Sequence, residues 1–147
     1  MRCVIQRVSE ASLDADGTPH AAIGAGLVVL VAVVEGDTER DRDWTAEKVA
    51  HLRVFEDDAG KMNRSALEVG AGVLLVPNFT LAGDARKGRR PSFDAAMRPP
   101  GAAAAFDALA DALRARGVPV RTGVFGAHMQ VRLVNDGPVT LVLDSRA

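Results

Sequence analysis

Two long apolar runs, both rich in branched side chains, constrain the fold of this chain more than any other feature. GLVVLVAVV spans residues 26–34, and VGAGVLLVPNFTL spans residues 69–81. Neither run alternates polar with apolar residues, which is typical of a strand covered on both faces. We therefore expect two buried strands, with the first at the centre of a sheet. Pro77 has no backbone N–H to donate, so strand pairing should end or bulge near it.

Two other segments have helical patterns. Residues 37–55 open with Asp37 and Thr38, which are favoured helix caps, and apolar positions then recur at helical spacing. We expect a helix of about four turns there. Residues 102–116 place apolar side chains on one helical face and are followed by Gly117, a residue favoured just beyond a helix C-terminus. This segment predicts a second helix.

The remaining segments suggest how the layers are arranged. Residues 1–24 predict a hairpin that turns at Asp16-Gly17, residues 53–65 a strand end and a turn, and residues 82–101 a loop. Three closing strands are expected at residues 118–123, 128–136 and 139–145, the last two separated by Gly137-Pro138. This order favours an α/β fold, a layered mixed sheet with helices on one side, in a single domain over residues 1–147.

Composition narrows the functional classes. Cys3 is the only cysteine, which excludes an internal disulfide and a thiolate metal site, so we expect a buried thiol. A net charge of −1 excludes the broad basic surface of a protein that binds long nucleic acids. No apolar run is long enough for a membrane span, and the N-terminus lacks targeting features, so a cytoplasmic location is expected. The one dense basic run is Arg86, Lys87, Arg89 and Arg90, with Arg98 a little beyond, and by composition alone it is a solvated loop.

The usual catalytic motifs are absent. His20, His51 and His128 are scattered without zinc-ligand spacing, and no nucleophile elbow or phosphate-binding loop occurs. We expect no metal and no cofactor. Two polar segments remain unusual, Pro77-Asn78-Phe79-Thr80-Leu81 after a buried strand and the NDGPVT stretch at residues 135–140. An ordinary turn explains the second segment, but a Gly-Pro pair can also present main-chain carbonyls rigidly.

Several long stretches, in the same order over the whole chain, resemble the D-aminoacyl-tRNA deacylase family. They are MRCVIQRVSEAS, the Gly36-Asp37-Thr38 step, LRVFEDDAGKMN, FTL followed by KGRRPSF, TGVFGAHMQVRLVNDGPVT and the terminal LDS. The resemblance implies a homodimer with its active site at the interface. It also implies hydrolysis of the ester that joins a D-amino acid, or glycine, to the 3′-terminal adenosine of tRNA.

By the same resemblance, Gly137-Pro138 is a cis unit that enters the partner's active site. Its carbonyls leave no room for an L side chain, which amounts to selection by steric rejection. Arg7 matches a family arginine that orients this turn. The backbone N–H groups of Phe79 and Thr80 are the candidates for an oxyanion hole, with the terminal 2′-OH of the tRNA assisting the chemistry.

The resemblance also assigns a nucleotide pocket. Phe125, Gly126 and Met129 match positions that line the site of the terminal adenosine, although core packing explains the two large side chains equally well. The basic run would then contact acceptor-stem phosphates.

One departure leaves alternatives open. The family usually has Ser-Gln where this chain has Pro77-Asn78, and a paralogous group that removes L-alanine mischarged onto tRNA also begins this motif with Pro. A deacylase acting on L-alanyl-tRNA is therefore one alternative. A non-catalytic binder of tRNA 3′ ends is another, and a hydrolase with Thr80 as nucleophile is a third. The third requires an adjacent base, which the sequence does not reveal.

Overall fold

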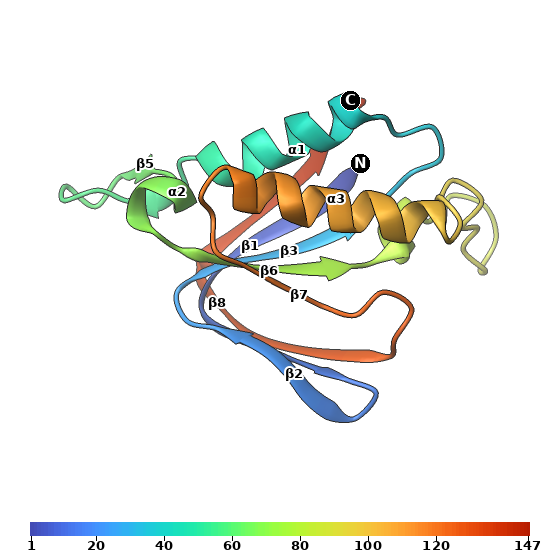
Figure 1. Cartoon of the computed structure of the whole chain (residues 1–147), viewed down its shortest axis with the longest axis horizontal. Coiled ribbons are helices and arrows are strands. Elements are labelled where there is room, and N and C mark those ends of the chain that lie inside the picture. Colours follow the sequence, from blue (N-terminus) through green and yellow to red (C-terminus); the bar gives the residue numbers. More distant parts are fainter.

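A six-stranded mixed sheet forms the middle of the molecule in a computed structural model that describes residues 1–147 (Figure 1). Its strands are β1 (Arg2–Ala15), β2 (Thr18–Ile23), β3 (Gly26–Ala32), β6 (Gly72–Pro77), β7 (Val120–Thr122) and β8 (Met129–Asp144). β1 pairs antiparallel with β2, β3 and β8, whereas β6 pairs parallel with both β3 and β7. A small separate sheet joins β4 (Phe55–Glu56) and β5 (Met62–Arg64).

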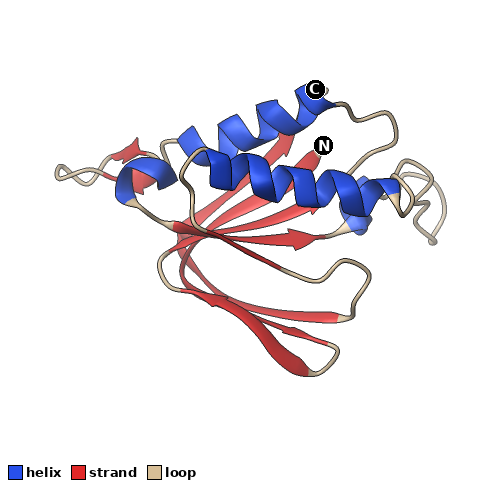
Figure 2. Ribbon diagram, viewed as in Figure 1, coloured by secondary structure: helices blue, strands red, loops and turns tan.

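Two long helices, α1 (Glu39–His51) and α3 (Gly101–Ala115), lie across one face of the sheet (Figure 2). The shorter elements are α2 (Ala66–Val69) and a single 3₁₀ turn, η1 (Phe79–Ala82). No helix combines the length and apolarity that crossing a bilayer requires.

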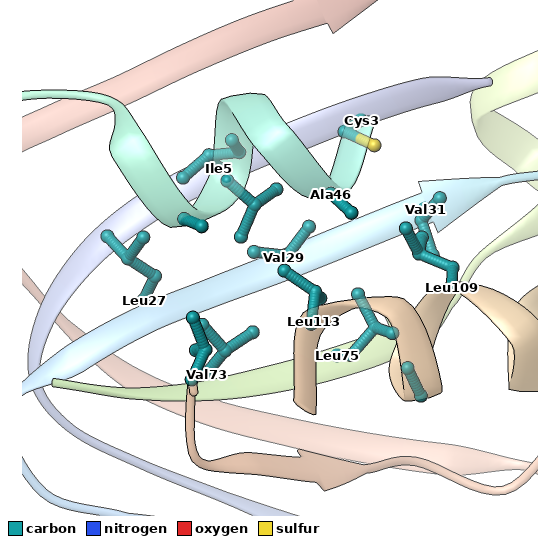
Figure 3. Packing of buried hydrophobic residues seen from close by; sticks show 14 of the residues in the cluster. Cys3, Ile5, Leu27, Val29, Val31, Ala46, Val73, Leu75, Leu109 and Leu113 are labelled. Carbon is teal, nitrogen blue, oxygen red and sulfur yellow. The ribbon is translucent and has the colours of Figure 1, made fainter. Parts of the chain in front are cut away.

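The main hydrophobic core lies between the two helices and the sheet. Leu27, Val29 and Val31 project from β3 toward Ala46 of α1 and Leu113 of α3 (Figure 3), and all are buried. Each large aliphatic side chain buried in this way stabilises the fold by about 1.5–3 kcal/mol. The alternate residues of β3 face the other side of the sheet.

A second, smaller core forms because the sheet folds over on itself. The C-terminal half of β1, with β2 and the N-terminal half of β8, makes a lower leaf under β3, β6 and β7 (Figure 1). Val28 and Leu74 from the upper leaf pack with Val8 and Leu13 from the lower leaf. β3 is therefore buried on both faces, as its unbroken apolar sequence predicted.

Most sequence-based expectations for the fold are confirmed. The N-terminal hairpin turns at Asp16 and Gly17, which both have positive φ. Thr38 caps α1 in a capping box with Asp41, and α3 ends just before Gly117, whose φ is +91°. The α/β class, with a mixed sheet and both long helices on one side, is as predicted.

Two expectations about strand bounds were wrong. The strands expected at 128–136 and 139–145 are one strand, β8, because both halves pair with β1 on either side of a bulge. The strand expected from residue 69 begins only at Gly72, because a capped turn of helix at Ser65 precedes it. It ends at Pro77, where its pairing was expected to end, and η1 follows it.

Candidate active site

A cleft of about 1600 Å³ opens between the two leaves of the sheet, at the carboxyl end of β6. Leu30 and Val76 line it from the upper leaf, and Met129, Val131 and Leu133 line it from β8. Ligand sites in α/β folds favour the carboxyl ends of parallel strands. Typical small-molecule pockets measure about 300–1,000 Å³, so this cleft has room for more than one small ligand.

The turn after β6 presents two free N–H groups beside this cleft. Asn78 donates its own N–H to the carbonyl of Val31 at 2.8 Å, and the chain then enters η1 at Phe79. The first N–H groups of a helix have no partner within it, and those of Phe79 and Thr80 donate to no acceptor in the chain. Two adjacent, unused donors have the arrangement that stabilises a developing oxyanion.

Thr80 has no base next to its hydroxyl. Its Oγ1 donates to the side-chain oxygen of Asn78, which also lines the cleft. No histidine or carboxylate is hydrogen-bonded to this hydroxyl, and no group of three or more His, Cys, Asp or Glu side chains in the chain could hold a metal ion. The Thr80 hydroxyl is thus bonded within the turn and has no base beside it.

Phe125, Gly126 and Met129 also line the cleft. The ring of Phe125 packs against Phe106 of α3, with the centroids 6.5 Å apart. One side of the ring therefore contacts the main core, and another lines the cleft. A Cβ at Gly123 would lie 2.8 Å from the sulfur of Met129. That close approach keeps the thioether at the cleft wall.

Phe93 is a cleft residue that sequence reasoning missed. Its ring meets that of Phe79 edge-on, with the centroids 5.2 Å apart, and it packs over Gly83, where a Cβ would lie 2.9 Å from the ring. Asp84 and Ser92 exchange backbone hydrogen bonds, which close the neck of the intervening basic loop. The one sequence signal was an aromatic residue inside a loop of charges, glycines and prolines.

The basic loop contributes unpaired cations to the rim of the cleft. Arg86 is held by Asp84 at 2.6 Å, and this contact lowers the pKa of the Asp84 carboxyl. Lys87, Arg89 and Arg90 make no ion pair within the chain, and Arg90 lines the cleft. Their charge is therefore available to an anion outside the fold.

Gly137 and Pro138 lie away from the cleft formed by their own chain. They are solvent-exposed, joined by a cis peptide bond, and absent from the cleft lining. The buried Arg7 holds the turn, donating through Nε to the carbonyl of Asp136 at 3.1 Å and through Nη1 to that of Val54 at 2.7 Å. The structure thus brings together Pro77, Asn78, Phe79, Phe125, Gly126 and Met129 at the cleft, with Thr80 adjacent, but not Arg7, Gly137 or Pro138.

β8 leaves one edge of the sheet free. It pairs with β1 on one side and with no strand on the other. Val134 is 50% exposed and Val142 77% exposed on this strand. An open edge with apolar side chains is a surface on which another chain can pair.

Comparison with known protein families gives a match over nearly the whole chain. The family model described as D-Tyr-tRNA(Tyr) deacylase matches residues 4–144. A D-aminoacyl-tRNA deacylase of Thermomicrobium roseum is 60% identical over 145 residues, covering 99% of this chain and 94% of that protein. One from Geobacter sulfurreducens is 55% identical over 147 residues, covering 100% of this chain and 97% of that protein.

Solved structures have the same architecture. A structure described as c-Myc DNA Unwinding Element Binding Protein superposes with a TM-score of 0.93 at 37% identity, and the match covers 100% of both chains. A probable eukaryotic D-amino acid tRNA deacylase gives a TM-score of 0.83 at 20% identity over 97% of both chains, a likeness that concerns the fold alone.

Proposed function

This chain belongs to the D-Tyr-tRNA(Tyr) deacylase family, and from that premise we propose that it hydrolyses D-aminoacyl-tRNA, and glycyl-tRNA, to the free amino acid and tRNA. The observation that carries the proposal is the pair of unused N–H groups at Phe79 and Thr80 beside a cleft large enough for a nucleotide and its amino acid. The relatives named as D-aminoacyl-tRNA deacylases match the chain end to end.

The reaction depends more on the positions of the attacking water and the ester carbonyl than on a strong base. Water attacks the ester carbonyl, the negative charge that develops on its oxygen is stabilised by the two N–H groups, and the 3′-oxygen of the ribose leaves with a proton. An aminoacyl ester is already activated, so oxyanion stabilisation supplies much of the acceleration. The neighbouring 2′-OH of the tRNA assists the proton transfer, which fits the absence of a basic side chain near Thr80.

The terminal adenosine would occupy the wall formed by Phe125, Gly126 and Met129. An aromatic ring and a thioether are suited to contacts with a base. Lys87 and Arg89, which have no partner in the chain, would then meet the phosphates that precede it. A local basic loop on a chain of net charge −1 suits an enzyme that handles only the end of a tRNA.

Selection against L-amino acids is assigned to Gly137-Pro138 acting on a second subunit. The turn is exposed, lies outside the cleft of its own chain, and is anchored by Arg7. Pairing of two copies through the free edge of β8 would let each turn enter the other's cleft, whose volume exceeds that of a single small ligand. The carbonyls of the turn would then occupy the space that an L side chain needs, so L-aminoacyl esters would be rejected sterically.

Aminoacyl-tRNA is made and used in the cytoplasm, so this is where the enzyme would act. The proposed partners are a second copy of the chain and the 3′ end of aminoacyl-tRNA, with no cofactor.

Deacylation assays with three substrates test the proposal. D-Tyr-tRNA and Gly-tRNA should lose their amino acid, while L-Tyr-tRNA should remain intact under the same conditions. Equal cleavage of the D and L substrates would contradict selection by exclusion. Saturable binding of D-Tyr-tRNA without ester loss, even at high protein concentration, would favour the non-catalytic binder of tRNA 3′ ends.

Pro77 supports a second candidate substrate. It lines the cleft in place of the usual serine, as in the paralogous group that removes L-alanine from mischarged tRNA. L-alanyl-tRNA belongs in the same assay series. Rapid cleavage of L-alanyl-tRNA, with L-Tyr-tRNA left intact, would assign the chain the removal of L-alanine from tRNA. The site would then admit the small methyl side chain of L-alanine but no larger L side chain.

A further inference from the structure

The Gly137-Pro138 turn is a bulge of unusual size within β8. Gln6 pairs with Thr140 and Val8 pairs with Asn135, so the four residues 136–139 stand opposite the single residue Arg7. An ordinary bulge sets two residues against one. The extra residues interrupt the ladder, and the backbone carbonyls at the base of the bulge need other donors.

The side-chain amide of Asn135 supplies those donors. Its Nδ2 donates to the carbonyl of Arg7 at 3.0 Å and to the carbonyl of Val139 at 3.0 Å, so one NH₂ group joins β1 to the far side of the bulge. Its Oδ1 accepts from the hydroxyl of Thr140 at 3.3 Å. That hydroxyl in turn accepts from Gln6 at 3.2 Å. Both the NH₂ group and the oxygen of the Asn135 amide are therefore hydrogen-bonded.

Close packing around Gly137 leaves the backbone of the turn little room to move. A Cβ there would lie 2.8 Å from a methyl group of Val139 and 3.1 Å from Nη2 of Arg7. Arg7 fixes the turn at Asp136, on its N-terminal side, whereas Asn135 fixes the base and the C-terminal side at Val139. The two side chains therefore fix different ends of the turn.

We propose that Asn135 is a positioning residue that locks the base of the Gly137-Pro138 turn and thereby sets how strictly L-aminoacyl esters are excluded. This inference rests on the proposed function, because it assigns Asn135 a part in the same selection. A carbonyl that excludes a side chain must be held to within a few tenths of an ångström, and a turn tied at one end only would yield to an L substrate.

The test is the variant Asn135→Asp, which keeps the shape of the side chain but replaces both donors with an acceptor. The readout is the ratio of kcat/KM for D-Tyr-tRNA to that for L-Tyr-tRNA, measured beside the thermal unfolding midpoint. We expect the ratio to fall by roughly tenfold or more, since two hydrogen bonds are lost and each is commonly worth a factor of about 2–10. The fall should come mainly from a faster reaction of the L substrate.

A matched control makes the same chemical change on the same strand. Gln130→Glu also turns an amide into a carboxylate in β8, but this side chain is exposed and lies outside both the turn and the cleft lining. Its D-to-L ratio should equal that of the unmodified protein. A folded Asn135→Asp protein whose ratio is also unchanged overturns the inference.

A milder variant covers the case in which Asn135→Asp does not fold. Thr140→Val removes the hydroxyl that donates to Oδ1 of Asn135 and accepts from Gln6. The ratio should then fall by about twofold or threefold, and no change would overturn the inference. The unmodified protein is measured first. If it fails to distinguish D-Tyr-tRNA from L-Tyr-tRNA, the proposed function is wrong. If discrimination survives both substitutions, only the positioning role of Asn135 is refuted.

Discussion

The guanidinium of Arg7 lies 3.1 Å from the backbone carbonyl oxygen of Asp136, across the two strands that carry them. The same side chain donates to Val54 at 2.7 Å, so it links the exposed turn in β8 to the segment that precedes the β4–β5 hairpin. Its side chain is only 8% exposed, and its acidic neighbours, Asp136 and Glu56, are largely solvated. Arg7 therefore acts through hydrogen bonds to carbonyls rather than through a buried ion pair.

Replacing Arg7 with Met should remove this link while filling most of its volume. We expect a loss of about 2–4 kcal/mol in the free energy of unfolding, because the carbonyls of Val54 and Asp136 lose their donor, together with a lower ratio of D-Tyr-tRNA to L-Tyr-tRNA hydrolysis, because the turn is no longer held. Urea denaturation and the deacylation assay measure the two effects. Arg132→Met is the control, since its pair with Asp14 is exposed and should contribute less than about 1 kcal/mol. An Arg7→Met protein as stable and as selective for D-Tyr-tRNA as the control would refute the role of the link.

Thr80→Val distinguishes positioning from covalent catalysis. If the hydroxyl only orders the turn through Asn78, the single-turnover rate should fall by less than about tenfold. A nucleophile would instead be indispensable, and its removal would cost a factor of at least about a thousand. A loss of that size, or an acyl-enzyme trapped on the unmodified protein, would rule out the positioning role.

The double variant Lys87→Ala/Arg89→Ala should weaken tRNA binding without altering the chemistry. We expect KM to rise by about tenfold with kcat unchanged, and the dependence of log KM on log salt to flatten by about 1.4, because two phosphate contacts are lost. Arg40→Ala/Lys61→Ala removes the same charge elsewhere and should leave KM as it was. Equal effects from the two double variants would mean that net charge, rather than the basic loop, attracts the tRNA.

Cys3 makes the stability of the fold sensitive to alkaline pH. Burial raises the pKa of its thiol from 9.0 to about 12. Between those values the unfolded chain loses the proton and the folded chain keeps it, so stability falls as pH rises above 9. Cys3→Ala lacks this loss. Its deficit relative to the unmodified protein, measured by urea denaturation, should therefore shrink by about 1.4 kcal/mol between pH 7 and pH 10. The chain has no tyrosine to obscure this interval. A constant deficit would mean that the thiol is accessible to solvent.

The elements predicted well were those whose signals are local. The unbroken apolar run at residues 26–34 is enough to predict a buried strand. The apolar face over residues 102–116, followed by Gly117, is enough to predict a helix and its end. Gly137-Pro138 was taken to separate two strands, because a sequence does not reveal that residues on both sides pair with β1. The amide that allows this, on Asn135, bonds to Arg7 more than a hundred residues away.

The candidate site was only partly accessible to sequence reasoning. Phe79, Phe125 and Met129 were assigned by resemblance, and they do line one cleft. Phe93 was missed because it has no periodic pattern and is identified only by its contact with Phe79. The separation of Gly137-Pro138 from that cleft is a tertiary property, and it is this separation that favours a site built from two subunits.

The most direct test of a shared site is complementation between two differently impaired subunits. Gly137→Ala should displace the turn, since its Cβ would clash with Val139, and Ala127→Trp should fill the cleft that Ala127 lines. Gly137→Ala alone should lose discrimination and hydrolyse L-Tyr-tRNA as well as D-Tyr-tRNA, whereas Ala127→Trp alone should be inactive on both. When the two are co-expressed in equal amounts, half of the dimers are mixed, and in each mixed dimer the one intact cleft receives the intact turn of the other subunit. About half of all intact clefts then lie in mixed dimers, so the account predicts that the ratio of L-Tyr-tRNA to D-Tyr-tRNA hydrolysis falls to about half of its value for Gly137→Ala alone. If the ratio stays at the value for Gly137→Ala, each turn acts on the cleft of its own subunit, and the account is contradicted.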